Sequence, residues 1–491
     1  MVEGRKILSL LVLTVFAWLP LGCSDSGSDL PIKVTVNPEF FRIPEGGTVR
    51  FSATVSGTLD KSVTWSLNGP GAIDPQTGQY ASIVGGQAAS ATITAINQAS
   101  GVAGNGGVGI TKFKKLFGEP VLGVDELAVG GLSVRGQSVD LNGDGILDLI
   151  AQDRSGNQVT VFGGLGDEAK FLPNLISVND PVAMVVGDFI PTGGFLADLA
   201  VASGLEKKIT FYQAVSNTIW KDQPPLISLG DVSVSPNTPV SLTTGRFHDN
   251  NETDIVISDL IVGTDNNEIV VFLQDRQFSG LKLDPGITRG VGGKPIQMIS
   301  TDFDLDGSID LAVVREGVSD LLILFGDGSG GFPSSGTVSF STALTDLATA
   351  DFNGDGVRDL VGGHAENQIS VLLGNGDGTF GPPQFIPLSS APGQIAIGDF
   401  NVGEFDDIAV ALPAENALFL LFGDGEGNLI GDWRFDTGLG SLTSLISGFF
   451  TGFQAPQGDQ SIELVYLGFD SMGSTDRFFL LRNQAISRIS F

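Results

Sequence analysis

Three short acidic segments have the residue types and the spacing of a loop that binds a calcium ion. Each places side-chain oxygens at its positions 1, 3, 5 and 9, a glycine at position 6, and a backbone carbonyl that can serve as a ligand at position 7. Oxygens in that number suit a hard cation that takes six to eight ligands. We therefore predict about three Ca²⁺ sites; the alternative is a set of acidic turns that only face solvent. The predicted ligands are Asp140, Asn142, Asp144, Ile146, Asp148, Asp302, Asp304, Asp306, Ser308, Asp310, Asp351, Asn353, Asp355, Val357 and Asp359.

The sequence around these segments argues against the helix-flanked calcium loop of an EF-hand. That loop ends in an acidic residue at position 12, where the three segments have Ala151, Val313 and Gly362. Each segment instead leads into a short apolar run rich in β-branched residues, such as 310–314. Runs of this length, bounded by glycine and asparagine, predict β-strands. We expect each ion in a loop between two strands.

The predicted calcium loops belong to a repeat that covers most of the chain. Its anchor is Gly-Asp-Phe, or a relic of it, followed by a strand-like run, and the anchors lie 48 to 58 residues apart. Four short strands in a unit of about 40–50 residues are typical of a β-propeller, whose sheets must stack to bury both faces. We predict an all-β protein with a seven-bladed β-propeller; an open array and two smaller bodies are the alternatives. The anchors are Asp140, Asp188, Arg246, Asp302, Asp351, Asp399 and Phe449.

The other four repeats depart from the calcium pattern. Position 5 of the Asp399 repeat is Gly403, so Asp399, Asn401 and Asp407 could form only a weak fourth site. The Arg246 repeat is interpreted as a loop of the same length, with His248 and Asn250 at positions 3 and 5 and with Arg246 paired to Asp249 or Asp254 in place of an ion. The Asp188 repeat has a longer loop without further acids before Asp198, and the Phe449 repeat has lost its acids.

These motifs resemble the FG-GAP/VCBS repeats of integrin α-subunit propellers and of many bacterial surface proteins. The resemblance covers residues 117–491 and is specific in the repeats at Asp140, Asp302 and Asp351. It implies that the cation loop joins the first two strands of a blade. Ring closure stays open, because residues 119–122 could complete the last blade and residues 486–491 compete for the same place.

The N-terminal segment predicts export and a lipid anchor. Arg5 and Lys6 precede an apolar stretch, 7–19, that is too short to span a membrane as a mature helix. Residues 1–22 resemble a bacterial lipoprotein signal, with lipid on Cys23, the only cysteine; a plain signal peptide with an incidental cysteine is the alternative. The serine, aspartate and glycine of residues 23–30 predict a polar tether. This resemblance implies a lipid-anchored protein of the bacterial envelope, at the outer membrane or cell surface.

Residues 31–105 have a different pattern, with apolar and polar residues alternating and no acidic loop. Segments 63–69 and 74–80 resemble bacterial Ig-like domains, which implies a small β-sandwich ahead of the propeller. The stretch rich in glycine and alanine that follows predicts a linker at 106–116.

Composition and motifs together favour binding over catalysis. A formal charge of −30 argues against nucleic acid as a partner, because phosphate binding depends on basic residues. Neither His248 nor His364 has a partner at catalytic spacing, and Trp220 and Trp433, in polar outer runs, are candidates for a binding rim. We expect a non-catalytic, calcium-stabilised surface lipoprotein that binds a protein or a polysaccharide and meets the membrane only through its lipid. The alternatives are a structural scaffold of an envelope assembly and a propeller-type polysaccharide lyase or hydrolase.

Overall fold

The computed structural model consists of β-strands and their connections, which confirms the predicted all-β class. Apart from one 3₁₀ turn, η1 (Pro413–Glu415), every regular element in the described part of the chain is a strand. The model describes residues 31–44, 46–83, 89–115, 134–143, 147–164, 171–190, 197–214, 226–248, 258–274, 281–401, 405–437, 441–448, 463–469 and 476–484.

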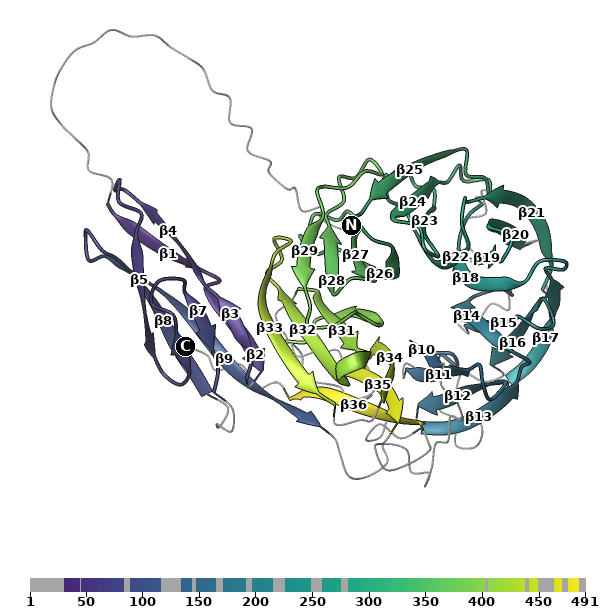
Figure 1. The fold of residues 1–491 in the computed structure, drawn as a ribbon, viewed down its shortest axis with the longest axis horizontal. Helices are drawn as coiled ribbons and strands as arrows, with labels where there is room; N and C mark the ends of the chain where they lie inside the picture. Colours follow the sequence, from purple (N-terminus) through teal and green to yellow (C-terminus); the bar gives the residue numbers. More distant parts are fainter. Residues whose placement is uncertain are drawn as a thin grey trace, which may run out of the picture.

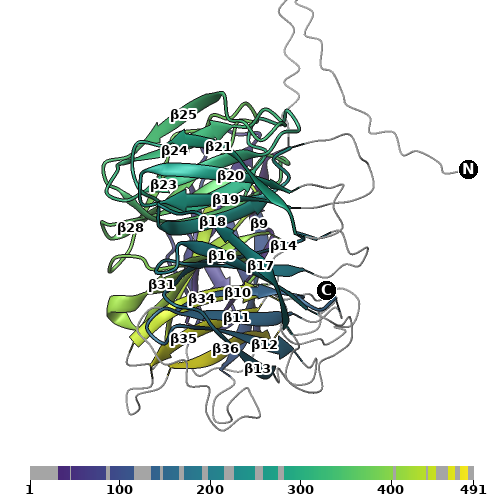
Figure 2. The ribbon, with the colours of Figure 1, turned by 90° about the vertical axis from the view of Figure 1, so that its right-hand side faces the viewer.

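Five separate sheets of four antiparallel strands follow one another along the chain, and in each sheet the strands pair in sequence order. Figure 1 shows them arranged radially around a common centre, with the first strand of each sheet innermost. Figure 2 shows that the strands run from one face of the ring to the other. The sheets are β10 (Val134–Val139), β11 (Asp148–Asp153), β12 (Gln158–Gly164) and β13 (Phe171–Ser177); β14 (Pro181–Gly187), β15 (Asp198–Ser203), β16 (Lys208–Ala214) and β17 (Leu226–Ser233); β18 (Pro239–Gly245), β19 (Asp259–Thr264), β20 (Glu268–Gln274) and β21 (Leu283–Gly290); β22 (Pro295–Thr301), β23 (Asp310–Arg315), β24 (Asp320–Phe325) and β25 (Ser334–Ser339); and β26 (Leu344–Ala350), β27 (Asp359–His364), β28 (Gln368–Leu372) and β29 (Gln384–Pro387).

Two larger sheets continue the ring and join it to the N-terminal part of the chain. In one, the row β30-β31-β32-β33 extends into β3, β7 and β6; in the other, β34-β35-β36 extends into β9, β8 and β5, with β2 parallel to β9. A separate pair, β1 and β4, completes the N-terminal part. The ring strands are β30 (Ile395–Gly398), β31 (Asp407–Leu412), β32 (Ala417–Gly423), β33 (Leu429–Asp436), β34 (Ser441–Gly448), β35 (Glu463–Phe469) and β36 (Asp476–Gln484). The N-terminal strands are β1 (Lys33–Asn37), β2 (Phe40–Pro44), β3 (Thr48–Arg50), β4 (Ser52–Ser56), β5 (Val63–Asn68), β6 (Ala72–Ile73), β7 (Gln79–Ala81), β8 (Ala89–Asn97) and β9 (Ala103–Lys115).

The second strand of each of the first six ring sheets is buried along its whole length. A strand covered on both faces is expected to be apolar throughout rather than alternating, and this explains the continuous apolar runs that follow each acidic loop. Apolar clusters fill the spaces between neighbouring sheets. A phenylalanine at loop position 2, as in Phe303 and Phe400, is almost fully buried. Burial of one such side chain contributes about 1.5–3 kcal/mol.

Five of the innermost strands have a β-bulge close to their first residue. The register shifts after residue one of the strand in β14, β18, β22 and β26, and between Leu442 and Ser444 in β34. A bulge places one extra residue in one strand and redirects the side chains that follow it. The residues after the bulge, among them Gln297 and Asp346, therefore differ in direction from what simple alternation would give.

The prediction of a linker at 106–116 is wrong for residues 106–115, which are part of strand β9. This strand pairs with β8 at residues 103–110 and with β36 at residues 112–115, so it is shared by the N-terminal part and the ring. The candidate closing strands 119–122 and 486–491 lie outside the described residues. Glycines occur here because neighbours approach closely: a Cβ on Gly104 would lie 2.3 Å from the carbonyl oxygen of Val34, and one on Gly107 would lie 2.7 Å from the Phe40 ring.

The N-terminal part packs directly on the ring. Strand β3 pairs with β33, and the hydroxyl of Thr48 donates a hydrogen bond of 2.9 Å to Asp432. The rings of Phe41 and Phe422 meet edge to face at 6.3 Å, and one buried cluster contains residues of both parts. Trp433 belongs to that cluster and is 9% exposed, so its predicted place on a binding rim is wrong. Trp220 lies outside the described residues.

Candidate metal centre

The loop between β22 and β23 gathers three of its predicted ligands. The carboxylates of Asp302, Asp304 and Asp310 offer oxygens that all lie within 4.8 Å of one another. Oxygen Oδ1 of Asp302 is buried and accepts no hydrogen bond from the part of the chain that the structure describes. A buried, unsatisfied carboxylate oxygen is costly unless a cation or donor meets it. The donor set, three carboxylates, is the type that Ca²⁺ prefers, so these residues fit a calcium ion.

The rest of this loop is held in shape by its own backbone. The N–H of Gly307 donates to Asp302 Oδ2 at 2.9 Å, and the N–H of Ser308 donates to Asp306 Oδ1 at 2.7 Å. Asp306 is not among the three clustered carboxylates, and its carboxylate therefore acts here as a turn acceptor. Leu305, at position 4, has a φ of 59°, where the other two loops have glycines with positive φ, Gly143 and Gly354.

Electrostatics of the loop favour a bound cation. Burial raises the pKa of Asp310 to about 6, and burial, followed by the nearby carboxylates, raises the pKa of Asp304. A raised carboxyl pKa means that the folded protein disfavours the negative charge there. A cation would supply the opposite charge and reverse that preference.

The loop between β26 and β27 has the same sequence pattern and the same kind of backbone hydrogen bonds to its side-chain oxygens, but its position 3 is an amide, Asn353, in place of a carboxylate. Asp351 accepts N–H bonds from Asp355 and Gly356 at 3.2 and 2.9 Å, and the amide of Asn353 donates to Asp355 at 2.8 Å. Among the described residues, the cluster of three carboxylates forms only in the 302–310 loop. Val357, at position 7, donates its N–H to Asp355 at 2.8 Å.

Two further loops are described in part. In the loop after β10, Asn142 is fully buried and the N–H of Gly143 donates to Asp140 Oδ1 at 2.8 Å; Asp144 and Ile146 lie outside the described residues. In the loop after β30, Asn401 is 1% exposed, and neither its amide oxygen nor its amide nitrogen has a hydrogen-bond partner. Gly403 lies outside the described residues, so the weak fourth site stays a prediction.

The aspartate that ends each loop, at position 9 in the loops with the calcium pattern, has a structural role that the sequence interpretation missed. It is fully buried in six repeats, with or without other acids in the loop. In each, its Oδ2 accepts the N–H of loop position 2 at 2.8–3.0 Å. In four, its Oδ1 accepts an N–H at or just after the end of the third strand at 2.8–2.9 Å. The signal was available, because an aspartate is the first residue of each of the six fully buried strands: Asp148, Asp198, Asp259, Asp310, Asp359 and Asp407.

This rule corrects the interpretation of the Arg246 repeat. The aspartate equivalent to position 9 of the other loops is Asp259, which accepts the N–H of Phe247 at 3.0 Å, and not Asp254. The ring of His248 also contacts that carboxylate, with Nδ1 2.8 Å from Oδ2. The loop is thus longer than predicted. Asp249 and Asp254, the suggested partners of Arg246, lie outside the described residues.

Glycine turns connect each of three loops to the next sheet. The N–H groups of Gly330, Gly378 and Gly427 donate to the position-2 carbonyls of the preceding sheets, Phe247, Phe303 and Phe352, at 2.8, 3.1 and 3.1 Å. All three glycines have positive φ. The geometry of each acidic loop is therefore coupled to packing between sheets.

His364 occupies a buried position at the end of β27. Its Nε2 lies 2.8 Å from the hydroxyl of Ser370, and its ring lies between those of Phe340 and Phe385. Burial lowers its pKa. These contacts give His364 a role in core packing.

Comparison with known proteins agrees with the repeat and the fold. Residues 302–362 and 351–402 match a family model described as FG-GAP-like repeat. No curated protein matches the chain significantly. Crystal structures of BBS1N in complex with ARL6DN, soaked with mercury and with lead, contain a chain that aligns with 15% identity, a TM-score of 0.50, 76% of this chain and 98% of that one.

The periplasmic gluconolactonase PpgL of Pseudomonas aeruginosa aligns at 11% identity and a TM-score of 0.47, covering 76% of this chain and 96% of that one, which is too remote to support an inference. In the described part of the chain, no helix is long and apolar enough to cross a membrane. The molecule is an all-β protein with several four-stranded antiparallel sheets that match β-propeller structures, and residues 302–362 and 351–402 carry FG-GAP-like repeats.

Proposed function

We propose that this chain is a calcium-stabilised binding protein of the bacterial surface, with a seven-bladed propeller preceded by an Ig-like domain and with lipid on Cys23. Its partner would be a surface protein or a polysaccharide, and its action non-catalytic. The observation that carries the proposal is the cluster of Asp302, Asp304 and Asp310, in which the buried Oδ1 of Asp302 has no hydrogen-bond partner in the described part of the chain.

Calcium would act here as a structural ion. It would be held by the three clustered carboxylates, and it would supply the positive charge that their burial otherwise makes costly. Extracellular calcium modules of this kind have dissociation constants of roughly 0.1–1 mM. At ten times that concentration one site stabilises the fold by about 1.4 kcal/mol. Such a site would hold the loop, and through the glycine turn the next sheet, in one arrangement.

The blade count rests on the order of strands around the ring. Five isolated four-stranded sheets, the row β30–β33 and the row β34-β35-β36-β9 support a total of seven. The buried Trp65, Phe51 and Tyr80 between the N-terminal strands support a sandwich that packs its tryptophan without a disulfide.

The first test is calcium titration by calorimetry on the mature chain, with thermal melts in calcium and in chelator. About three sites and a higher melting temperature in calcium are expected. The absence of any binding heat and of any melting shift would reject the calcium part of the proposal.

The second test is co-sedimentation of the chain with envelope fragments that have been treated with protease or with periodate, which cleaves vicinal diols of sugars. Loss of binding after protease identifies a protein partner, and loss after periodate identifies a polysaccharide. Failure to sediment with untreated envelopes in calcium would reject the binding function.

A scaffold role is the second candidate, and the packing of the N-terminal part on the ring favours it, because β3 pairs with β33 and one buried cluster spans both parts. Crosslinking in intact envelopes separates the two. A scaffold yields crosslinks of fixed stoichiometry, whereas an adhesive binder exchanges with added free chain.

A further inference from the structure

The second ring sheet, which consists of β14 to β17, holds two carboxylates with buried oxygens that lack a donor. Asp188 directly follows β14 and Asp198 begins β15, so they correspond to Asp302 and Asp310 of the 302–310 loop. Asp198 is fully buried. Oxygen Oδ1 of each residue is buried and accepts no hydrogen bond from the part of the chain that the structure describes. Because such an oxygen is costly, a donor or a positive charge is expected beside it.

Four other sheets give the equivalent of Asp198 a donor for this oxygen. In each of them, Oδ1 accepts an N–H at or just after the end of the third strand at 2.8–2.9 Å. In the second sheet the third strand is β16, and the side chain of its Gln213 hydrogen-bonds to Asp198 but leaves Oδ1 without a partner. The second sheet therefore departs from the rule that the other sheets follow.

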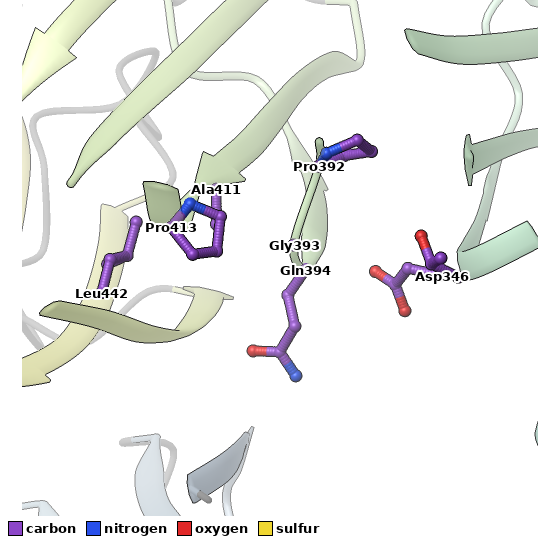
Figure 3. Close-up of a pocket in the computed structure, with 8 residues that line it drawn as sticks. Asp346, Pro392, Gly393, Gln394, Ala411, Pro413 and Leu442 are labelled. Atoms are coloured by element: carbon purple, nitrogen blue, oxygen red, sulfur yellow. The ribbon is translucent and has the colours of Figure 1, made fainter. Parts of the chain in front are cut away.

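Polar side chains at another contact between sheets have their donors. Figure 3 shows Asp346, in β26, and Gln394, directly before β30, which line a pocket between sheets. Asp346 Oδ2 accepts the N–H of Ile395 at 2.7 Å, and Gln394 Oε1 accepts the N–H of Leu445 at 2.9 Å. The shortage of donors in the second sheet is thus not a general property of the contacts between sheets.

The two carboxylates of the second sheet lie close enough to share one donor. The N–H of Ile190 lies 3.2 Å from Asp198 Oδ2, and the same N–H is hydrogen-bonded to Asp188. Asp198 Oδ2 also accepts the N–H of Phe189 at 2.8 Å. Two backbone N–H groups of the described residues thus serve both carboxylates. Two negative charges at this separation disfavour each other.

Burial raises the pKa of both carboxyls. The pKa of Asp188 rises to about 6, and that of Asp198 rises to about 7, with the charge of Asp188 as a smaller cause. The titratable and charged groups of the adjacent strand and of the corresponding loops in the neighbouring sheets are Tyr212, Asp140, Asp148, Arg246, His248 and Asp259. None of these groups is among the main causes of either shift. The pair and its burial therefore set its own protonation.

We propose that Asp188 and Asp198 share one proton at neutral pH, as a carboxylic acid that is hydrogen-bonded to a carboxylate. The proton makes one unpartnered oxygen a donor to the other. It also removes one of two like charges from a buried place. A proton would thus do here what we assign to a calcium ion in the 302–310 loop, and it would do so whether or not the other loops bind calcium.

The shared proton affects the contact between the second and third sheets. The backbone N–H of Asp188 donates to the hydroxyl oxygen of Ser258 at 3.2 Å, and the N–H of Ser258 donates to the carbonyl of Asp188 at 2.5 Å. Ser258 directly precedes β19, the fully buried strand of the third sheet. Loss of the proton would place two negative charges beside this contact, so the contact should weaken as pH rises.

The direction of the pH dependence follows from the pKa values of the folded and unfolded chains. An aspartate of the unfolded chain loses its proton near pH 3.9, whereas the folded pair keeps one up to a pH of about 6 to 7. The stability that the pair contributes is full below the unfolded pKa and is lost as pH rises through the folded pKa. For one proton, the equilibrium constant for unfolding rises by up to about tenfold for each pH unit in this window.

The test is urea unfolding of the full mature chain in chelator between about pH 4 and pH 8, with Asp188→Asn and Asp198→Asn beside the wild type. Asparagine keeps an oxygen for the N–H groups, and its amide supplies the missing donor at every pH. Each variant should therefore show a smaller rise of the unfolding constant with pH than the wild type. Asp436→Asn removes a carboxylate that is 80% exposed and is the matched control. His364 titrates with the opposite sign, but it is present in every chain and cancels in the comparison.

Infrared spectroscopy of the folded chains gives a second measurement, which does not depend on unfolding. At neutral pH the wild type should show the C=O stretch of one protonated carboxyl that each asparagine variant lacks. Equal pH dependence of unfolding in the wild type and both variants would overturn the proposal. So would a difference spectrum, wild type minus variant, without a protonated carboxyl at neutral pH, since both groups would then be ionised. If one variant does not fold, the other variant and its difference spectrum decide.

Discussion

Replacement of Asp302 by asparagine should have opposite effects with and without calcium. Asparagine has nearly the same shape, and its oxygen can still accept the N–H of Gly307 that Asp302 accepts at 2.9 Å. Its amide nitrogen, however, would replace the buried oxygen that has no hydrogen-bond partner. The variant therefore loses a cation ligand while keeping the turn.

The magnitudes follow from charge and mass action. In chelator, the variant removes one of three clustered carboxylates, so its melting temperature should equal or exceed that of the wild type. In calcium at ten times the dissociation constant, the wild type gains about 1.4 kcal/mol at this site, which the variant lacks. A change of this size moves the melting temperature of a large domain by roughly 3–5 °C.

The assay is differential scanning calorimetry of both chains in calcium and in chelator, with Asp436→Asn as the control for a lost exposed charge. Asp436 lies on the outer strand β33 and its side chain is 80% exposed. An equal calcium-induced shift in Asp302→Asn and the wild type would refute the assignment of this cluster.

Three further predictions concern the frame around the sites. Gly378→Ala should destabilise the fold by about 1–3 kcal/mol more than Gly317→Ala. Both glycines have positive φ, but a Cβ on Gly378 would lie 2.1 Å from Phe325, whereas one on Gly317 meets nothing. Equal denaturation midpoints of the two variants would contradict the coupling between loop and turn. Because burial lowers the pKa of His364, the unfolded chain takes up this proton at a higher pH than the folded chain, so stability should decrease below pH about 6.5. Urea titrations at several pH values should show a weaker pH dependence of the unfolding free energy for His364→Gln. An unchanged pH dependence would show that His364 is not its cause. Thr48→Val should lower the free energy of unfolding by about 1–2 kcal/mol, because it leaves Asp432 without its donor. Thr94→Val removes an exposed hydrogen bond and should lower it by less. Equal melting temperatures of the two variants would show that the Thr48–Asp432 bond does not stabilise the contact between the N-terminal part and the ring.

The repeat could be predicted from the sequence because its signals are local. An aspartate, a glycine turn and a buried apolar run recur at nearly even spacing, and each has its own physical cause. Where two copies of the signal lie close together, the pattern cannot choose between them. Both Asp254 and Asp259 precede apolar runs, and the choice of Asp259 depends on hydrogen bonds from Phe247 and Gln274.

Contacts between distant segments could not be predicted in this way. Trp433 lies in a polar outer strand, and its burial comes from the N-terminal part nearly four hundred residues away. The glycines of β9 indicated a flexible linker, yet they allow Val34 and Phe40 to pack against the strand. Of the predicted ligands, the sequence could not show that Asp306 would serve as a turn acceptor while Asp302, Asp304 and Asp310 gather.

The position of β9 also sets an order of events during biosynthesis. Residues 112–115 are made early, but their partners in β36, residues 481–484, are made last of all the described strands. Until then the ring has two unpaired edges, and such edges invite association with other chains. Closure must also bring together segments that are far apart in sequence, which slows folding. A chain interrupted before residue 476 would therefore present open strand edges to proteases and to its neighbours.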